Sequence, residues 1–230
     1  MEPHSLYDYF ERRHSSIFSA ESRHPNPFIT ISREYGCPSK FVAHSLVEKL
    51  NLNSEGKNKW EYINKEIIAD TANKINVNTE KIRKYFSDEE HNSFQDFLES
   101  FSSKYYINNK LIQKTIRNVV EFYALKGFCV IVGRGGVAIT KSIPSGIHIR
   151  LQAPIDWRVE KICHTNNVSP AQAIKDIIEI DNKRNALIES FLRKKPDDIL
   201  FDLVINCSCF SIDNISDLII RAIEIKGLIK

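Results

Sequence analysis

The segment from Phe28 to Leu50 constrains the fold of this chain more than any other stretch. It begins with the apolar run Phe28–Ile31, continues through a turn at Ser32–Lys40, and ends in Phe41–Leu50, where apolar residues recur at helical spacing. A strand, a tight turn and a helix in this order open many α/β nucleotide-binding domains, whose turn and helix N-terminus receive phosphate. The segment therefore predicts an α/β domain with a phosphate-binding turn.

The turn itself departs from the Walker A motif, G-x-x-x-x-G-K-[ST], of phosphate-binding turns. Gly36 is its one glycine, and Cys37–Lys40 follows. Pro38 removes an amide donor, and the missing glycines restrict the approach of backbone to phosphate. Phe41 stands after the lysine, where the motif has a hydroxyl residue for magnesium. The sequence alone leaves open whether this turn holds phosphate.

Composition excludes several classes of protein. At 230 residues, with 42% hydrophobic and 27% charged residues, the chain suits one globular domain. Its net charge of +3 is too balanced to indicate a nucleic-acid partner. No apolar run approaches the roughly 20 residues of a membrane span, and residues 1–27 contain no signal-peptide core. We therefore expect a cytoplasmic protein without membrane or nucleic-acid partners; the sequence does not indicate its oligomeric state.

The cysteines favour the same compartment. Their number is odd, and no C-x-x-C pair occurs, so we expect free thiols in a reducing environment rather than disulfides or zinc ligands. The five are Cys37, Cys129, Cys163, Cys207 and Cys209.

Beyond the first helix the chain continues to alternate strands with helices. Besides 28–31, we expect strands at 60–63, 128–132, 147–151 and 200–206, and helices at 64–74, from 78, within 87–103, and at 108–126, 154–163, 169–193 and 215–225. This alternation indicates a mainly parallel, five-stranded sheet covered by helices on both faces. The helical, irregular stretch between the second and third strands is typical of a substrate-binding insertion.

A second candidate site is the glycine-rich turn Gly133–Gly136, which directly follows an apolar run. Ligands of open α/β sheets bind at the carboxyl ends of the strands, where we expect this turn. Glycine lets backbone amides approach a ligand closely, and Arg134 offers a planar fork for phosphate. The alternative interpretation is a tight turn with an exposed arginine.

The long helix expected at 169–193 carries charge on its apolar face. Asp181 and Arg184 interrupt the stripe that runs from Ile174 to Phe191. Charges in such positions must be paired or face a cleft, so these two form either a buried ion pair or part of a site. Phosphoryl transfer needs fixed positive groups, which a closing lid can supply. Basic residues gather on this helix and the one before it: Arg158, Lys161, Lys183, Arg193, Lys194 and Lys195.

The sequence gives little support for a metal site or for a serine-based catalytic triad. The seven histidines do not cluster, and the adjacent Cys163 and His164 have a poor spacing for one metal on a helix, so we expect no resident metal site. No G-x-S-x-G or Ser/His/Asp pattern is present. Trp60, Tyr62 and Trp157 are candidates for stacking on a base, with core packing as the alternative.

Six stretches, in order along the chain, resemble motifs of the cytidylate kinase-like family, a branch of the P-loop nucleoside monophosphate kinases. They are ITISREYG at 29–36, YINKEI at 62–67, VIVGRG at 130–135, RLQAPIDWRV at 150–159, the D-x-x-R pair Asp181 and Arg184, and FDLVIN at 201–206. The chain departs from the family pattern at Cys37–Lys40, which replaces S-G-G-R, and at Asn64, which replaces an aspartate.

The resemblance implies a three-layer α/β domain of the P-loop kinase type at 28–230, preceded by an N-terminal arm at 1–27. It places an acceptor-side insertion at about 60–107 and a lid region at about 158–197. The implied reaction moves the γ-phosphoryl group of ATP, with magnesium, onto a nucleoside monophosphate, cytidine monophosphate first.

The resemblance also implies roles for single residues. The ATP-binding set is Arg33, Glu34, Tyr35, Gly36, Cys37, Pro38, Ser39 and Lys40. The acceptor-binding set is Tyr62, Asn64, Glu66, Gly133, Arg134 and Gly135. The catalytic set is Lys40, Arg134, Arg158, Asp181 and Arg184.

Because the phosphate turn departs from the family pattern, two other functions stay open. One is a nucleotide-binding or regulatory relative with impaired phosphoryl transfer. The other is a small-molecule kinase with a non-nucleotide acceptor.

Overall fold

Five parallel strands form the centre of the protein. The computed structural model describes residues 26–54, 58–64, 110–195 and 198–229. Its single sheet has the order β2-β3-β1-β4-β5, and every neighbouring pair is parallel. The strands are β1 (Phe28–Arg33), β2 (Glu61–Ile63), β3 (Cys129–Val132), β4 (Gly146–Gln152) and β5 (Leu203–Asn206). The predicted α/β class with a five-stranded parallel sheet is confirmed.

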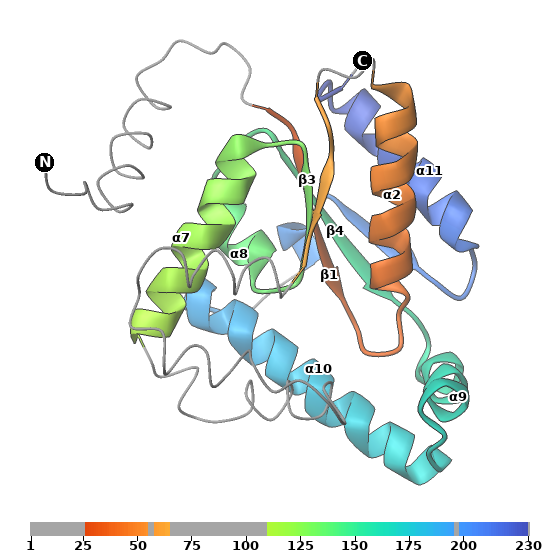
Figure 1. Ribbon diagram of the computed structural model, residues 1–230. Helices are drawn as coiled ribbons and strands as arrows, with labels where there is room; N and C mark the ends of the chain where they lie inside the picture. Colours follow the sequence, from red (N-terminus) through yellow and green to blue (C-terminus); the bar gives the residue numbers. More distant parts are fainter. Residues whose placement is uncertain (1–25, 55–57, 65–109, 196–197, 230) are drawn as a thin grey trace, which may run out of the picture.

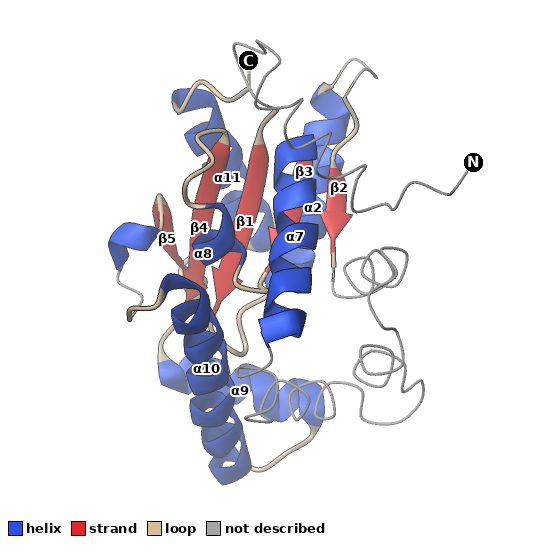
Figure 2. Cartoon of the chain, turned by 90° about the vertical axis from the view of Figure 1, so that its left-hand side faces the viewer, coloured by secondary structure: helices blue, strands red, loops and turns tan. Residues whose placement is uncertain are grey.

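Helices cover both faces of this sheet (Figure 1). On one face lie α2 (Ser39–Asn53) and α11 (Ile212–Ile225), and on the other lie α7 (Lys110–Lys126) and the short α8 (Gly136–Thr140). The remaining two, α9 (Ile155–Asn166) and α10 (Pro170–Leu192), extend beyond the carboxyl ends of the strands (Figure 2). Of the helices that the structure describes, none has the length and apolar character to cross a membrane.

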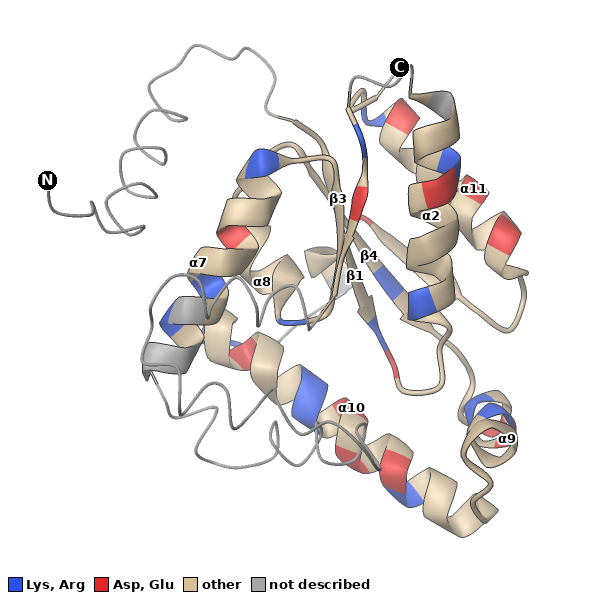
Figure 3. Cartoon of the chain, viewed as in Figure 1, with Lys and Arg blue, Asp and Glu red and all other residues tan. Residues whose placement is uncertain are grey.

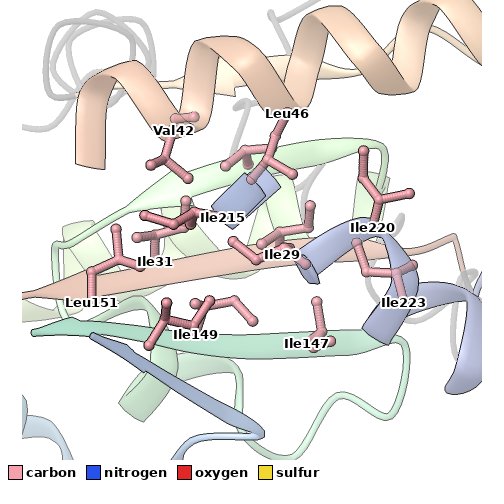
Figure 4. Close-up of a cluster of buried hydrophobic side chains, with 14 of the residues drawn as sticks. Ile29, Ile31, Val42, Leu46, Ile147, Ile149, Leu151, Ile215, Ile220 and Ile223 are labelled. Carbon is pink, nitrogen blue, oxygen red and sulfur yellow. The ribbon is translucent and has the colours of Figure 1, made fainter. Parts of the chain in front are cut away.

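The apolar residues of β1 serve two cores, because successive side chains of a strand point to opposite faces. Ile29 and Ile31 pack with Val42 and Leu46 of α2 and with the isoleucines of α11 (Figure 4). Phe28 instead joins the residues of α7 and α8 on the other face. All three β1 side chains are fully buried, and each stabilises the fold by about 1.5–3 kcal/mol. A strand apolar on both faces is therefore held at the centre of three layers.

Local signals place the ends of two helices. Ser169 caps α10 by accepting a hydrogen bond from the Gln172 N–H, with Pro170 as the first helical residue. Gly127 follows α7 with φ +74°, and its N–H donates to the Tyr123 carbonyl. Both ends agree with the sequence-based expectation for these helices.

Several boundaries differ from the expectation: the first strand continues to Arg33, past Ile31, and α9 continues to Asn166, past Cys163. The first helix begins at Ser39 rather than Phe41 and the last at Ile212 rather than Ile215, where Ser211 provides the cap. The last strand begins at Leu203, because 198–200 form a 3₁₀ turn. The helix α8 was not predicted, since its five residues are too short and too completely buried for helical periodicity to show. The helices expected at 64–74, from 78 and within 87–103 lie essentially outside the described residues.

Candidate functional site

A cleft opens at the carboxyl edge of the sheet. It is bounded by the turn after β1, the turn after β3, and the helices α9 and α10. In a parallel sheet this edge is where ligands bind, because the turns after adjacent strands meet there. Both basic and acidic residues lie on α9 and α10 and near the ends of the strands (Figure 3), and charges of both signs line the cleft.

The turn after β1 packs tightly on α9. Gly36 has φ +91°, and a Cβ built on it would lie 3.1 Å from the Arg158 Cβ. Two amides of the turn are bonded within it: the Cys37 N–H donates to the Glu34 carbonyl at 3.3 Å, and the Ser39 N–H donates to the Cys37 carbonyl at 2.9 Å. The turn is therefore compact, and fewer of its amides can face a phosphate than in a glycine-rich loop.

Asp181, on α10, bonds both to this turn and to α9. Its Oδ1 accepts a hydrogen bond from the Tyr35 N–H at 2.7 Å, and its Oδ2 lies 2.6 Å from the Arg158 Nη1. Arg158 also donates to the Tyr35 carbonyl at 3.3 Å. The two side chains thus hold the Tyr35 backbone at both its N–H and its carbonyl, and we call Asp181 and Arg158 the turn clamp. Within the described part of the chain, Asp181 forms its ion pair with Arg158, on another helix, rather than with Arg184.

Glu34 anchors the start of the turn. Its Oε2 accepts a hydrogen bond from the Ala153 N–H at 3.1 Å and lies 3.5 Å from the Arg158 Nε. Its Oε1 lies 3.9 Å from the Arg150 Nη2. Although Glu34 borders the cleft, its carboxylate is bonded to Ala153 and Arg158, where β4 leads into α9.

Three arginines lie near one another beside the turn. Arg33 lies against Gly133, where an added Cβ would stand 2.0 Å from the Arg33 Nη1. Arg184 reaches from α10 and donates to the Arg33 carbonyl at 3.2 Å. Arg134 is buried in the turn after β3. We call these three residues the arginine cluster.

The electrostatics of the arginine cluster favour an anion. Burial first, and then the nearby charges of Arg184 and Arg134, hold the pKa of Arg33 well below its usual value. Burial also lowers the pKa of Arg184, against the effect of Asp181. Like charges held together in a partly desolvated place gain from a bound anion, and guanidinium groups match the oxygens of phosphate. The cluster is therefore a candidate phosphate site.

The structure brings most of the predicted site residues to this one cleft, but it regroups them. Arg33, predicted with the phosphate turn, points to the glycine-rich turn beside Arg134. The remaining predicted residues that border the cleft are Tyr35, Gly36, Cys37, Pro38, Ser39, Lys40, Tyr62, Asn64 and Gly135. Gly133 adjoins it through Arg33, whereas Glu66 lies outside the described residues.

Several residues that border the cleft were not assigned to the site from sequence, Arg150 and Phe210 among them. Arg150, near the carboxyl end of β4, lies with its guanidinium over the Phe201 ring at 5.4 Å. Phe210 follows β5 and is 47% exposed. A position at or just after the carboxyl end of a parallel strand is the signal that identifies both. Trp60, by contrast, is a core residue, whereas Tyr62 and Trp157 border the cleft.

Comparison with known proteins decides the family. A family model described as "Cytidylate kinase-like family" matches residues 28–209. The chain belongs to the cytidylate kinase-like family. The matched range runs from β1 to the loop after β5, so it contains the phosphate turn, the turn clamp and the arginine cluster. The predicted family is thereby confirmed.

Individual relatives are distant. The cytidylate kinase of Sulfolobus acidocaldarius is 28% identical over 205 residues, which cover 87% of this chain and 96% of that protein. A uronate isomerase of Corynebacterium glutamicum is 26% identical over 130 residues, 56% of this chain; the match spans only 25% of that relative's length. A crystal structure of an uncharacterized protein from Eubacterium ventriosum shares the fold, with a TM-score of 0.63 at 21% identity, covering 86% of this chain and 98% of that one.

Proposed function

We propose that this member of the cytidylate kinase-like family transfers the γ-phosphoryl group of ATP to a nucleoside monophosphate, with cytidine monophosphate as the first candidate. The observation that carries the proposal is the arginine cluster, which faces the same cleft as the phosphate turn. Two phosphate sites that share one cleft are what a phosphotransferase requires, because the donor and acceptor oxygens must approach in line.

In this proposal one side of the cleft binds ATP and the other side binds the acceptor phosphate. The N-terminus of α2 and Lys40, which is exposed, face the phosphates of ATP. Arg33 and Arg134 hold the acceptor phosphate, and Arg184 places positive charge between the two. The turn clamp acts on the turn rather than on substrate, since its groups are bonded to Tyr35.

In this proposal magnesium binds together with ATP rather than as an ion held by side chains of the protein. The carboxylates of Glu34 and Asp181 are engaged by backbone amides and by Arg158. Phe41, 63% exposed, occupies the position of the hydroxyl ligand. Magnesium commonly keeps several waters and binds through substrate phosphates, so a nucleotide-borne ion fits these residues better than a protein-held one.

One observation favours a second function, a nucleotide-binding relative with impaired phosphoryl transfer. The internal hydrogen bonds at Cys37 and Ser39, together with the missing amide of Pro38, reduce the number of donors that the turn can offer to ATP. Such a chain would bind an acceptor nucleotide at the arginine cluster and turn over slowly or not at all.

A coupled ADP-release assay with a panel of nucleoside monophosphates and small hydroxylated acceptors tests both functions. We expect turnover with a monophosphate, fastest with cytidine monophosphate. Arg134→Ala should raise the KM of the acceptor by about 10-fold to 100-fold, because a charged hydrogen bond contributes about 1.5–3 kcal/mol. The control is Arg221→Ala, on an exposed arginine of α11.

The outcomes separate the candidate functions. Binding of nucleotide in calorimetry without turnover supports the impaired relative. Turnover with a non-nucleotide acceptor alone supports the small-molecule kinase. Absence of any nucleotide affinity in folded protein contradicts both nucleotide-based functions. An unchanged acceptor KM in Arg134→Ala contradicts the assignment of the arginine cluster.

A further inference from the structure

The Tyr35 side chain leaves the phosphate turn and lies between α9 and α10. Only 8% of the residue is exposed, and its ring belongs to a small apolar cluster with Ile162 of α9 and Ala173, Ile177 and Ile180 of α10. A ring so deeply buried offers little surface to a ligand in the cleft. What the ring can do is therefore decided by the groups of the protein around it.

Tyr35 is held at both ends. The turn clamp bonds to its backbone N–H and carbonyl, and at the other end the Asn166 Nδ2 donates to the Tyr35 Oη at 2.9 Å. Asn166 is the last residue of α9. Burial, as the largest cause, raises the pKa of Tyr35, so the phenol stays neutral. The ring is therefore an uncharged aromatic surface with a defined orientation.

The Arg184 guanidinium lies over this ring. The Arg184 Cζ is 5.8 Å from the centre of the Tyr35 ring, and the Arg184 Nη1 donates to the Arg33 carbonyl at 3.2 Å. A cation within about 6 Å of an aromatic face is attracted to it, most strongly where water is excluded. An arginine side chain has many rotamers in water and loses that freedom when its head group is held. The ring and the carbonyl together fix the head group of Arg184 beside Arg33.

We propose that Tyr35 is a positioning residue, whose ring holds the Arg184 guanidinium where it stabilises the transferred phosphoryl group. This task rests on the proposed function, in which Arg184 places positive charge between donor and acceptor; the contact of ring and guanidinium does not. A charge that is already in place when the transition state forms costs no reorganisation at that moment. The role differs from the contact with ATP that the family resemblance implies for Tyr35.

The alternative is that Tyr35 only fills the space between α9 and α10. Removal of a filling side chain lowers stability, and any loss of rate should then be the same whether or not Arg184 is present. A positioning residue acts through Arg184, so its effect on the rate should vanish once the guanidinium is gone.

The test compares Tyr35→Leu, Arg184→Ala and the double variant in the coupled ADP-release assay, at saturating ATP and cytidine monophosphate. We expect Tyr35→Leu to lower kcat by about 10-fold or more, with the KM of ATP changed much less. In the Arg184→Ala background the same change should alter kcat by no more than about 2-fold. Tyr35→Phe, which keeps the ring, should restore most of the kcat that Tyr35→Leu loses.

A second measurement serves if Tyr35→Leu fails to fold. Phenylalanines with increasing numbers of ring fluorines are placed at position 35, because fluorine weakens the negative face of the ring with little change in its size. We expect kcat to fall stepwise with fluorine content and to stay level in the Arg184→Ala background. The matched control is Phe122→Leu, on a partly buried ring of α7, which should cost stability without lowering kcat.

Two results would overturn the positioning role: an equal loss of kcat from Tyr35→Leu with and without Arg184, or a kcat that does not respond to fluorination. Absence of turnover in the unchanged protein with every acceptor contradicts the proposed function instead, and the task in catalysis with it. Denaturant titration still decides the contact in that case. The double variant should lose less stability than the two single variants together, and strict additivity overturns the contact.

Discussion

Gly133 determines where the Arg33 guanidinium can lie. Its backbone is in the left-handed region at φ +74°, and its missing side chain leaves the space that the Arg33 Nη1 fills. The Gly133 N–H also donates to the Ile31 carbonyl at 3.0 Å, which keeps the glycine-rich turn beside β1. A single hydrogen in place of a methyl group thus permits the arginine cluster.

Gly133→Ala is expected to damage the arginine cluster as well as the fold. An alanine at this φ costs about 1–2 kcal/mol of stability, and its Cβ would displace the Arg33 guanidinium. We expect the acceptor KM to rise at least 10-fold in the coupled assay.

Gly227→Ala is the matched control for this change. Gly227 has a similar φ of +71°, but an added Cβ would have nothing within 4 Å. Both variants should lose similar stability in chemical denaturation, and only Gly133→Ala should affect the acceptor. Equal KM values in the two variants would show that the position of Arg33 does not matter to binding.

Local sequence pattern singled out both Arg134 and Arg33, but it could not show that their side chains lie close together. Arg134 lies between glycines directly after an apolar strand, so local pattern was enough. Arg33 adjoins the phosphate turn in sequence, and only the pairing of β1 with β3 carries its side chain to Gly133. Such a pairing joins distant segments, and no local signal specifies it.

The turn clamp shows that residues of several elements together hold the geometry of the site. The turn belongs to the β1–α2 unit, but its geometry is held by one residue of α9 and one of α10. Arg158 is buried, with 8% of its side chain exposed, whereas Asp181 retains 20%. A movement of α10 relative to α9 would therefore also move the phosphate turn.

A double-mutant cycle on Asp181→Ala and Arg158→Ala tests this arrangement by denaturant titration. Asp181→Ala leaves Arg158 with Glu34 as its ion-pair partner, and Arg158→Ala leaves Asp181 with the Tyr35 N–H, so we expect each single change to cost about 3 kcal/mol or less. The double change should cost less than the sum of the two, with a coupling of about 0.5–3 kcal/mol.

The same cycle with Arg184→Ala in place of Arg158→Ala provides the comparison. Arg184 donates to the Arg33 carbonyl, so its coupling to Asp181 should be the smaller of the two. A larger coupling for Arg184 than for Arg158 is the result that would contradict the turn clamp.

Sequence periodicity located Asp181 and Arg184 on the inner face of a helix but could not choose the partner of Asp181. The spacing of three residues favours a pair within α10, as is common on helices. The structure instead satisfies Asp181 across the α9–α10 interface, because the phosphate turn inserts its Tyr35 peptide there.

At the scale of the whole molecule, a buried histidine links stability to pH. His148 of β4 lies beside the Phe28 ring, and its Nδ1 is 2.8 Å from the Thr30 Oγ1. The backbone N–H of His148 donates to Asp202, which also accepts from Lys226. Burial chiefly lowers the pKa of His148 to about 4.

Stability is therefore expected to fall as the pH drops from about 6.5 toward 4. In that window the unfolded chain binds a proton at His148 that the folded chain does not, which disfavours folding by up to about 3 kcal/mol. His148→Asn, which can retain a bond to Thr30, should lessen this loss in denaturation series at several pH values. His164→Asn, on an exposed histidine of α9, should not. Identical pH profiles for His148→Asn and the unchanged protein would contradict this role.

The overall architecture was the most predictable level. Alternation of strands with helices gives the parallel sheet, and apolar runs identify the strands buried on both faces. The order β2-β3-β1-β4-β5 was not predictable from these patterns, because it depends on which distant strands pair. The composition of the cleft follows from that order, since it brings the turns after β1 and β3 together.

The central position of β1 also has a consequence for how the protein is made. Phe28 pairs with Cys129 on one side and with Gly146 on the other, so β1 leaves the ribosome long before either neighbour exists. Loop closure over such separations is slow, and an apolar strand without partners invites aggregation. During synthesis, β1 is therefore made well before β3 and β4, the two strands that it pairs with.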